Sequence, residues 1–255
     1  MDILETIRRV IASRSFQHEE EVIDPCFWRV DMHSHLLPGV DDGVSNLEQT
    51  VACLKQLASW GIRKVITTPH VSGDWYPNES TQLKASQAML QALANENGLD
   101  LQVEVAAEYL LDEFFPELLN TDALLTFGPA RYVLVELGWA AAPLYLDDLL
   151  FRLRAKGYTP ILAHPERYTY YHDNPSALAH LHENGYLFQL NWGSLTGRYG
   201  ERVQAQARFL LKKGWVDFLG SDLHRPTDLK ALATLFKMPE YEQLKSQPLL
   251  NESLC

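Results

Sequence analysis

The chain alternates between short apolar segments rich in β-branched residues and longer segments with the spacing of amphipathic helices. In one predicted helix, Leu47, Val51 and Leu54 fall on the same face. Ser45 is expected to cap the start of this helix as part of a capping box, and Gly61 follows its last turn. The apolar segments predict seven strands, at residues 30–33, 64–68, 101–107, 131–136, 159–163, 186–191 and 216–220.

Alternating strands and helices are typical of parallel sheets, because each helix carries the chain back to the end where the previous strand began. Seven such units in 255 residues favour an α/β fold with a closed or nearly closed barrel over an open doubly wound sheet. Residues 1–29 precede the first unit, and the apolar spacing at 2–12 predicts an amphipathic helix. We therefore expect an N-terminal helical extension at 1–29 and a barrel domain at 30–255.

The composition is that of a soluble globular protein, with 46% hydrophobic and 22% charged residues. The net charge of −11 argues against general binding to nucleic acids or acidic membranes. Charged residues interrupt the apolar positions near the N-terminus, so neither a signal peptide nor a membrane anchor is predicted, and a cytoplasmic location is expected. Cys26, Cys53 and Cys255 lack paired or metal-binding spacing, which argues against a disulfide framework.

Side chains that bind metal ions recur where the predicted strands end. His33 and His35 are two residues apart on an extended segment, so their rings face the same side, and Asp222 and His224 repeat this spacing. In a parallel barrel all of these strand ends share one face, where such enzymes place their active sites. The predicted metal ligands are His33, His35, Asp42, His70, Glu108, His164, Asp222 and His224.

A single histidine near a strand end is more often a hydrogen-bonded structural residue than a ligand. Here five of nine histidines stand at strand ends beside three carboxylates, and the joint pattern favours metal binding. The other histidines, His18, His172, His180 and His182, show no such pattern and are expected at the surface.

Imidazole and carboxylate ligands without thiolates suit Zn, Mn or Fe better than Ca or Mg. Eight ligands exceed the needs of one ion, so two or three divalent ions are expected, which would activate water and bind the oxygens of a transferred phosphoryl group. Cysteine-based phosphatase chemistry needs an arginine six positions after the cysteine, but Met32 and Ser59 stand at that spacing from Cys26 and Cys53.

Several motifs, taken together and in this order, closely resemble the PHP (polymerase and histidinol phosphatase) superfamily. They are Asp-Met-His-Ser-His-Leu-Leu-Pro-Gly-Val-Asp-Asp-Gly at 31–43, Thr-Pro-His at 68–70, Ala-Glu-Tyr at 107–109, Ala-His-Pro-Glu-Arg-Tyr at 163–168 and Ser-Asp-Leu-His at 221–224. Within that superfamily the chain looks like the bacterial tyrosine-protein phosphatases of capsule and exopolysaccharide operons. The first and fourth motifs are the most specific.

The resemblance implies a distorted seven-stranded TIM-like (β/α)7 barrel with three metal ions, most often manganese, with Fe, Zn, Co or Mg as alternatives. It implies one ion held by His33, His35, Glu108 and Asp222, and a second by Asp42, His70 and His224. Glu108 would bridge towards a third ion at His164. The implied substrate is a phosphotyrosine protein, typically a bacterial tyrosine kinase that controls polysaccharide export.

We expect hydrolysis by a metal-bound hydroxide, with Arg167 holding the phosphate and Asp42, His224 or a bound water protonating the leaving phenolate. Arg225 follows His224 directly, whereas family members often carry an arginine several residues later, so a phosphate-binding role for Arg225 is a weaker expectation. The alternatives are a small-molecule phosphomonoesterase of the histidinol-phosphate type and a phosphotyrosine-binding module without catalysis.

Residues beside the motifs are weaker candidates for substrate contact. Asn191 ends the sixth predicted strand and Ser194 lies just after it, so both are expected on the same face as the ligands. Six aromatic side chains would either line a phosphotyrosine pocket or pack in the core, and packing is preferred for each taken singly: Trp75, Tyr76, Tyr109, Tyr168, Trp192 and Tyr199.

Overall fold

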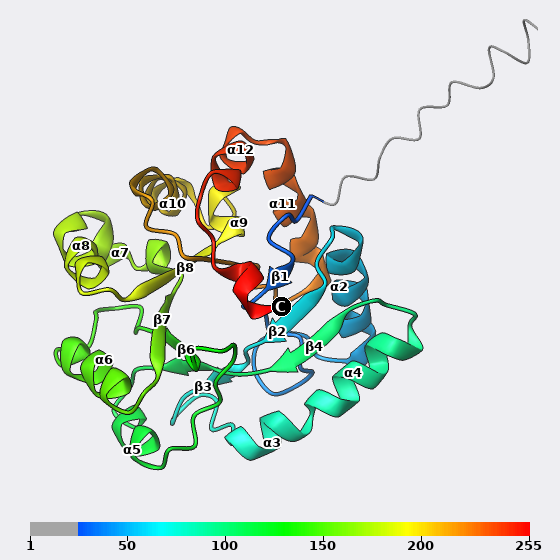
Figure 1. The fold of residues 1–255 in the computed structure, drawn as a ribbon, viewed down its shortest axis with the longest axis horizontal. Coiled ribbons are helices and arrows are strands. Elements are labelled where there is room, and N and C mark those ends of the chain that lie inside the picture. Colours follow the sequence, from blue (N-terminus) through cyan, green and yellow to red (C-terminus); the bar gives the residue numbers. More distant parts are fainter. Residues whose placement is uncertain (1–24) are drawn as a thin grey trace, which may run out of the picture.

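The structure is a computed structural model that describes residues 25–255. Its strands are β1 (Val30–Asp31), β2 (Lys64–Thr67), β3 (His70–Val71), β4 (Gln102–Val105), β5 (Glu108–Leu110), β6 (Tyr132–Glu136), β7 (Thr159–Ala163), β8 (Leu187–Asn191) and β9 (Phe218–Gly220). Every pair of adjacent strands is parallel, and helices connect most of them. The fold is therefore mixed α/β with a curled parallel arrangement of strands, as predicted (Figure 1). The helix predicted at 2–12 lies outside the described residues, so the division at residue 29 stays a prediction.

The second and third predicted strands are each followed directly by a further short strand that was not predicted. β2 and β3 are separated by Thr68 and Pro69, and β4 and β5 by Ala106 and Ala107. Proline has no amide hydrogen to donate to a neighbouring strand, which favours a break at Pro69. The result is a three-stranded sheet in the order β1-β2-β4 and a six-stranded sheet in the order β3-β5-β6-β7-β8-β9, where one continuous barrel sheet was expected.

The segments after β1 and β9 lie next to each other. An isolated parallel bridge joins Ser34 to Leu223. The amide of Asp222 donates to the carbonyl of His33 at 2.8 Å, and the amide of His35 donates to the carbonyl of Leu223 at 2.9 Å. The two ligand pairs predicted from i, i+2 spacing are thus held side by side by backbone hydrogen bonds.

Helices pack around the strands (Figure 1). They are α2 (Leu47–Ser59), α3 (Ser80–Ala85), α4 (Gln87–Glu96), α5 (Phe115–Asn120), α6 (Leu146–Ala155), α7 (Thr169–His172), α8 (Pro175–Glu183), α9 (Trp192–Leu195), α10 (Glu201–Lys213), α11 (Leu229–Ala233) and α12 (Pro239–Lys245). The cap of α2 differs from the prediction, because the side chain of Asn46, one residue after Ser45, accepts the Gln49 amide. No helix in residues 25–255 is long and apolar enough to span a bilayer.

Alternate residues of the strands contribute to two apolar clusters. In β2, Val65 packs in the larger cluster with residues of the surrounding helices, whereas Ile66 packs in a smaller one with Met32 and Phe218. This alternation is expected for strands that are buried on both faces. Leu254, in the C-terminal 3-10 helix η4 (Asn251–Leu254), belongs to the smaller cluster.

Asn251 joins the first and last strands beside that cluster. Its side-chain amide donates to the carbonyls of Val30 and Leu219 at 2.8 Å each, and its oxygen accepts the Leu219 amide at 2.9 Å. All of these groups are buried, so the hydrogen bonds replace contacts that the strand backbone would otherwise make with water. In Figure 1 this C-terminal segment lies against β1.

Candidate metal centre

His33 and His35 lie side by side, and both are close to the carboxylates of Glu108 and Asp222. Both histidines are fully buried, and their Nε2 atoms are 3.3 Å apart. The Oε2 atom of Glu108 lies 3.1 Å from Nε2 of His33 and 3.4 Å from Nε2 of His35. The Oδ1 atom of Asp222 lies 3.5 Å from both nitrogens.

The outer nitrogens of these histidines face hydrogen-bond acceptors. Nδ1 of His33 lies 2.8 Å from Oε1 of Gln189, and Nδ1 of His35 lies 2.7 Å from Oδ2 of Asp41. Nδ1 of His224 lies 3.0 Å from the carbonyl oxygen of Asp222. An acceptor at Nδ1 fixes one proton there, so each Nε2 carries the lone pair whenever the imidazole is neutral, the form that binds a cation.

Two such lone pairs in close contact, as on His33 and His35, repel each other unless a cation lies between or beside them. Each is also close to a buried carboxylate, which accepts hydrogen bonds but cannot donate one when ionised. This donor set fits divalent cations that take nitrogen and oxygen ligands.

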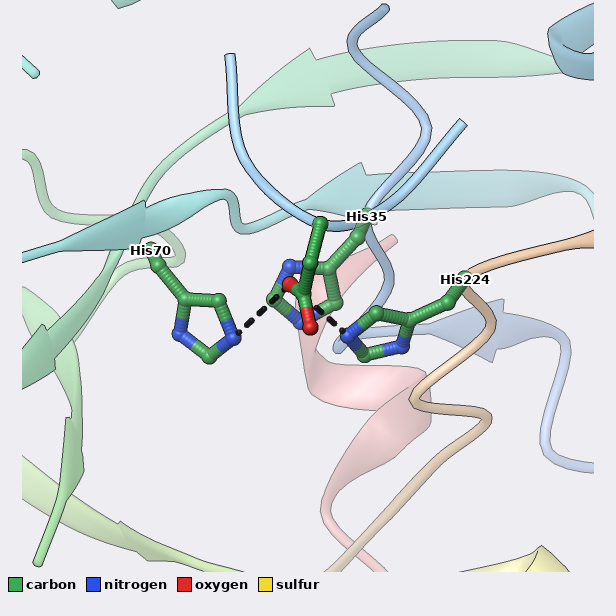
Figure 2. Close-up of side chains that lie close together, drawn as sticks. His35, His70 and His224 are labelled. Atoms are coloured by element: carbon green, nitrogen blue, oxygen red, sulfur yellow. Dashed lines mark ion pairs between the residues drawn. The ribbon is translucent and has the colours of Figure 1, made fainter. Parts of the chain in front are cut away.

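A second group contains His35, Asp42, His70 and His224, whose ligand atoms all lie within 4.8 Å of one another. Oδ1 of Asp42 is 3.5 Å from Nε2 of His70 and 3.5 Å from Nε2 of His224. Figure 2 shows the three labelled imidazoles turned towards one carboxylate, although they come from three distant parts of the chain. The geometry therefore brings together residues that the sequence placed at three different strand ends.

A third group consists of His70, Glu108 and Glu136. Glu136 was not among the predicted ligands. Its Oε2 atom lies 3.6 Å from Nδ1 of His70, and its Oε1 atom lies 3.7 Å from Nε2 of His164. Oε1 of Glu108 lies 3.0 Å from the same nitrogen of His164. Glu136 is the last residue of β6, so the strand-end argument applied to the fourth predicted strand would have found it.

Two buried carboxyl groups of the centre have opposite pKa shifts. Burial alone would raise the pKa of Glu108, but the positive charge that His33 and His70 carry when protonated outweighs burial and holds it well below its usual range. Burial and the nearby negative charge of Glu108 raise the pKa of Glu136 well above its usual range. Burial also lowers the pKa of His164 to about 4, so its imidazole is neutral at physiological pH and has a lone pair for a cation.

Arg167 stands beside the centre, in the wall of a cavity of about 670 Å³. Its Nη1 atom lies 2.7 Å from Oδ2 of Asp222, and its guanidinium lies between the rings of Trp139, at 4.6 Å, and Tyr199, at 4.4 Å. Arg225 also lines the cavity but is exposed, and its side chain makes no hydrogen bond or ion pair with another residue in 25–255. Five predicted ligands and Glu136 also line the cavity: Asp42, His70, Glu136, His164, Asp222 and His224.

Asn191, the last residue of β8, and Ser194 lie at the ligand-bearing strand ends but not at the cavity surface. Asn191 and Ser194 are buried and do not line the cavity. Asn191 donates from Nδ2 to Oδ2 of Asp222 at 2.7 Å and accepts from Nε2 of Gln189 at 2.8 Å. The hydroxyl of Ser194 donates to Oε1 of Glu166 at 2.6 Å. Asn191 therefore holds the predicted ligand Asp222 in place, whereas Ser194 holds Glu166.

The aromatic candidates divide into two groups. Trp75, Tyr76 and Tyr199 line the cavity. Tyr109, Tyr168 and Trp192 are fully buried in the core, because each packs between strands and helices.

The histidines without a strand-end pattern stay outside the centre. His180 is exposed and His182 stacks on Trp215. His172 is partly buried, and its ring is 2.7 Å from the carbonyl of Glu166. His18 lies outside the described residues.

Residues 29–234 match the family described as "Capsular polysaccharide synthesis, CpsB/CapC". The tyrosine-protein phosphatase YwqE of Bacillus subtilis (strain 168) is 31% identical over 195 residues, which cover 76% of this chain and 77% of the relative. The putative tyrosine-protein phosphatase CapC of Staphylococcus aureus is 30% identical over 222 residues, which cover 85% of this chain and 87% of the relative.

A solved structure has the same fold. It comes from a study of YwqE from Bacillus subtilis and CpsB from Streptococcus pneumoniae, described as unique metal-dependent tyrosine phosphatases. It superposes with a TM-score of 0.79 at 28% identity and covers 88% of this chain and 93% of that chain. The motifs, the fold and these similarities agree, and the chain belongs to the CpsB/CapC family.

Proposed function

We propose that this protein is a metal-dependent protein-tyrosine phosphatase. The observation that carries the proposal is the convergence of lone-pair nitrogens and buried carboxylates on one cavity, with a guanidinium in its wall. Relatives that are named tyrosine-protein phosphatases support the same activity.

We propose two or three divalent ions, most often manganese, held by the eight predicted ligands together with Glu136. The three groups of ligand atoms support this number, since His35, His70 and Glu108 each belong to two of them. Bound ions would activate water and neutralise charge on the phosphoryl oxygens.

The protein's own side chains would orient the phosphate and assist the leaving group. The planar guanidinium of Arg167 presents paired N–H donors that match phosphate oxygens. Asp42 and His224 stand at the open side of the centre, where Asp42 is half-exposed, so either could pass a proton to the departing phenolate. Phenolate is a fairly good leaving group, with a pKa of about 10, so this assistance need not be large.

The proposed substrate is a phosphotyrosine protein, a bacterial tyrosine kinase that controls capsular or exopolysaccharide synthesis, in the cytoplasm. We also propose that the seven strand positions form one distorted barrel, with residues 1–29 as an extension. The bridge between Ser34 and Leu223 supports closure between the first and last positions.

Hydrolysis of p-nitrophenyl phosphate, a phosphotyrosyl peptide and histidinol phosphate should be measured with Mn²⁺ and after exhaustive chelation. We expect metal-dependent turnover with preference for the phosphotyrosyl peptide. Preference for histidinol phosphate would favour a small-molecule phosphomonoesterase, and peptide binding without phosphate release would favour a binding module. His33→Ala and Glu108→Ala should abolish turnover, whereas His180→Ala, an exposed histidine outside the centre, should not.

A further inference from the structure

Large apolar side chains gather on three loops beside the cavity. Three of the eight exposed large hydrophobic residues in 25–255 lie there: Trp75 and Trp139, which line the cavity, and Phe114, which lies against Gly73. Trp75 is 78% exposed, Trp139 52% and Phe114 45%. Single exposed apolar residues are ordinary, but a cluster around a binding site marks an interaction surface. We name these three residues the apolar rim.

The three loops are neighbours because the strands that precede them are neighbours. The loops follow β3, β5 and β6, which pair in that order. The amide of Gly73 donates to Oδ2 of Asp112 at 3.0 Å, and a Cβ atom at Gly73 would lie 2.1 Å from the ring of Phe114. The loops that follow β3 and β5 are therefore in direct contact. In Figure 1 the helices that follow these loops, α3, α5 and α6, lie in succession along one side of the molecule.

The apolar rim is continuous with the cavity. Trp75 and Trp139 line the cavity together with His70 and His164. The ring of Trp139 stacks on His164 at 5.9 Å with an interplanar angle of 9°. When the phosphate group of a substrate is bound at Arg167, the remainder of the substrate must extend out of the cavity. It passes either these aromatic side chains or the opposite wall.

The charges on the loops are all negative. Asp74 and Glu113 are exposed, and segments 71–79, 111–115 and 137–148 contain no lysine or arginine. These loops would repel an acidic chain and attract a basic one. Their apolar side chains would gain contact area only from a partner that is itself apolar.

We propose that the apolar rim binds the residues next to phosphotyrosine in the protein substrate, and that these residues are apolar and basic, not acidic. This inference rests on the proposed function, because it assigns the segment that accompanies the phosphotyrosine. It divides the surface into a cavity that holds the phosphate and a rim that selects the protein.

The test compares phosphotyrosyl peptides of equal length that differ only in their flanks: Leu with Lys, Ser with Lys, and Ser with Glu. Affinities are measured by fluorescence anisotropy on the full chain with Mn²⁺, using a phosphonate analogue of phosphotyrosine that cannot be hydrolysed. Turnover of the phosphate peptides and of p-nitrophenyl phosphate is measured in parallel. We expect affinity to fall in the order given, by about fivefold at each step.

Phe114→Ser should weaken binding of the Leu-Lys peptide about fivefold. It should leave p-nitrophenyl phosphate kinetics unchanged, because that substrate has no flanking residues and Phe114 does not line the cavity. Phe151→Ser is the matched control, since Phe151 is 65% exposed but lies within α6, outside the rim. Glu113→Gln should reduce the preference for Lys over Glu. Equal affinities for the three peptides, or equal effects of Phe114→Ser and Phe151→Ser, would overturn the inference. Failure of the wild-type protein to hydrolyse any aryl phosphate would count against the proposed function instead, since the binding measurement does not depend on turnover.

Discussion

Gln189 holds His33 through a hydrogen bond of 2.8 Å between Oε1 and Nδ1, and neither side chain reaches solvent. The other end of the Gln189 amide donates to Asn191, which in turn donates to Asp222. The side-chain amides of Gln189 and Asn191 thus link His33 to Asp222 through buried hydrogen bonds. Their donors and acceptors can alternate in only one direction along this chain, which fixes the proton of His33 on Nδ1.

Gln189→Met should weaken metal binding about 10- to 100-fold, because the Nδ1–H group of His33 loses its buried acceptor and the ring loses its fixed orientation. The measurement is Mn²⁺ titration by calorimetry, with metal content after dialysis as a second readout. Gln206→Met is the matched control, since Gln206 is also buried but lies on α10 away from the centre. Equal metal affinity in the two variants would contradict a supporting role for Gln189.

Arg167→Lys should lower kcat/KM about 10- to 100-fold while Mn²⁺ remains bound. Lysine keeps the positive charge beside Asp222 but lacks the planar pair of donors and stacks less well between Trp139 and Tyr199. Arg225→Lys should change kcat/KM much less, because Arg225 is exposed at the cavity edge. A larger loss for Arg225→Lys would transfer the phosphate-binding role to that residue.

Glu166 should make stability depend on pH. Burial raises its pKa from 4.5 to about 7, and its Oε2 atom has no hydrogen-bond partner among the described residues. The folded protein therefore holds this proton more tightly than the unfolded chain. The stabilisation that results is full below pH 4.5 and is lost as pH rises towards 7, by up to about 3 kcal/mol.

Glu166→Gln removes this titration. The free energy of unfolding of the wild type, relative to the variant, should therefore fall between pH 5 and pH 8. Urea unfolding in the presence of chelator measures it, with the exposed Glu242→Gln as control. A difference that is constant across this range would show that Glu166 has an ordinary pKa.

Asn251→Ala should destabilise the protein by about 2–4 kcal/mol, because three buried backbone groups of β1 and β9 lose their partner. Thermal unfolding monitored by circular dichroism measures the loss. Glu252→Ala, at the exposed neighbouring position, is the control. The kcat of the folded fraction should not change, since Asn251 lies at the end of the strands away from the centre.

The sequence was sufficient to predict where the ligands meet. His33, His70 and Glu108 follow strands that periodicity identifies, and parallel strands end on one face. Periodicity could not show that Asn191 turns away from the cavity to hold Asp222, because the side-chain direction at a strand end depends on the following residues. The same limit applies to Asp41, whose carboxylate supports His35 while its neighbour faces the cavity.

The short strands β3 and β5 were missed. The predicted strands end at residues 68 and 107, and the structure places a further strand just beyond each of them, after a break at Thr68–Pro69 and at Ala106–Ala107. Pro69 was the available signal, since proline inside a strand indicates a break or an edge. Nothing comparable marks Ala106, whose break follows from pairing with the interrupted neighbour.

These breaks separate two tasks along the chain. β2 and β4 lie in the sheet β1-β2-β4, whereas β3 and β5, which begin with His70 and Glu108, lie in the other sheet. An apolar substitution in β2 or β4 therefore acts first on the packing of one sheet. The backbone positions of His70 and Glu108 are set by their pairing with each other in the second sheet.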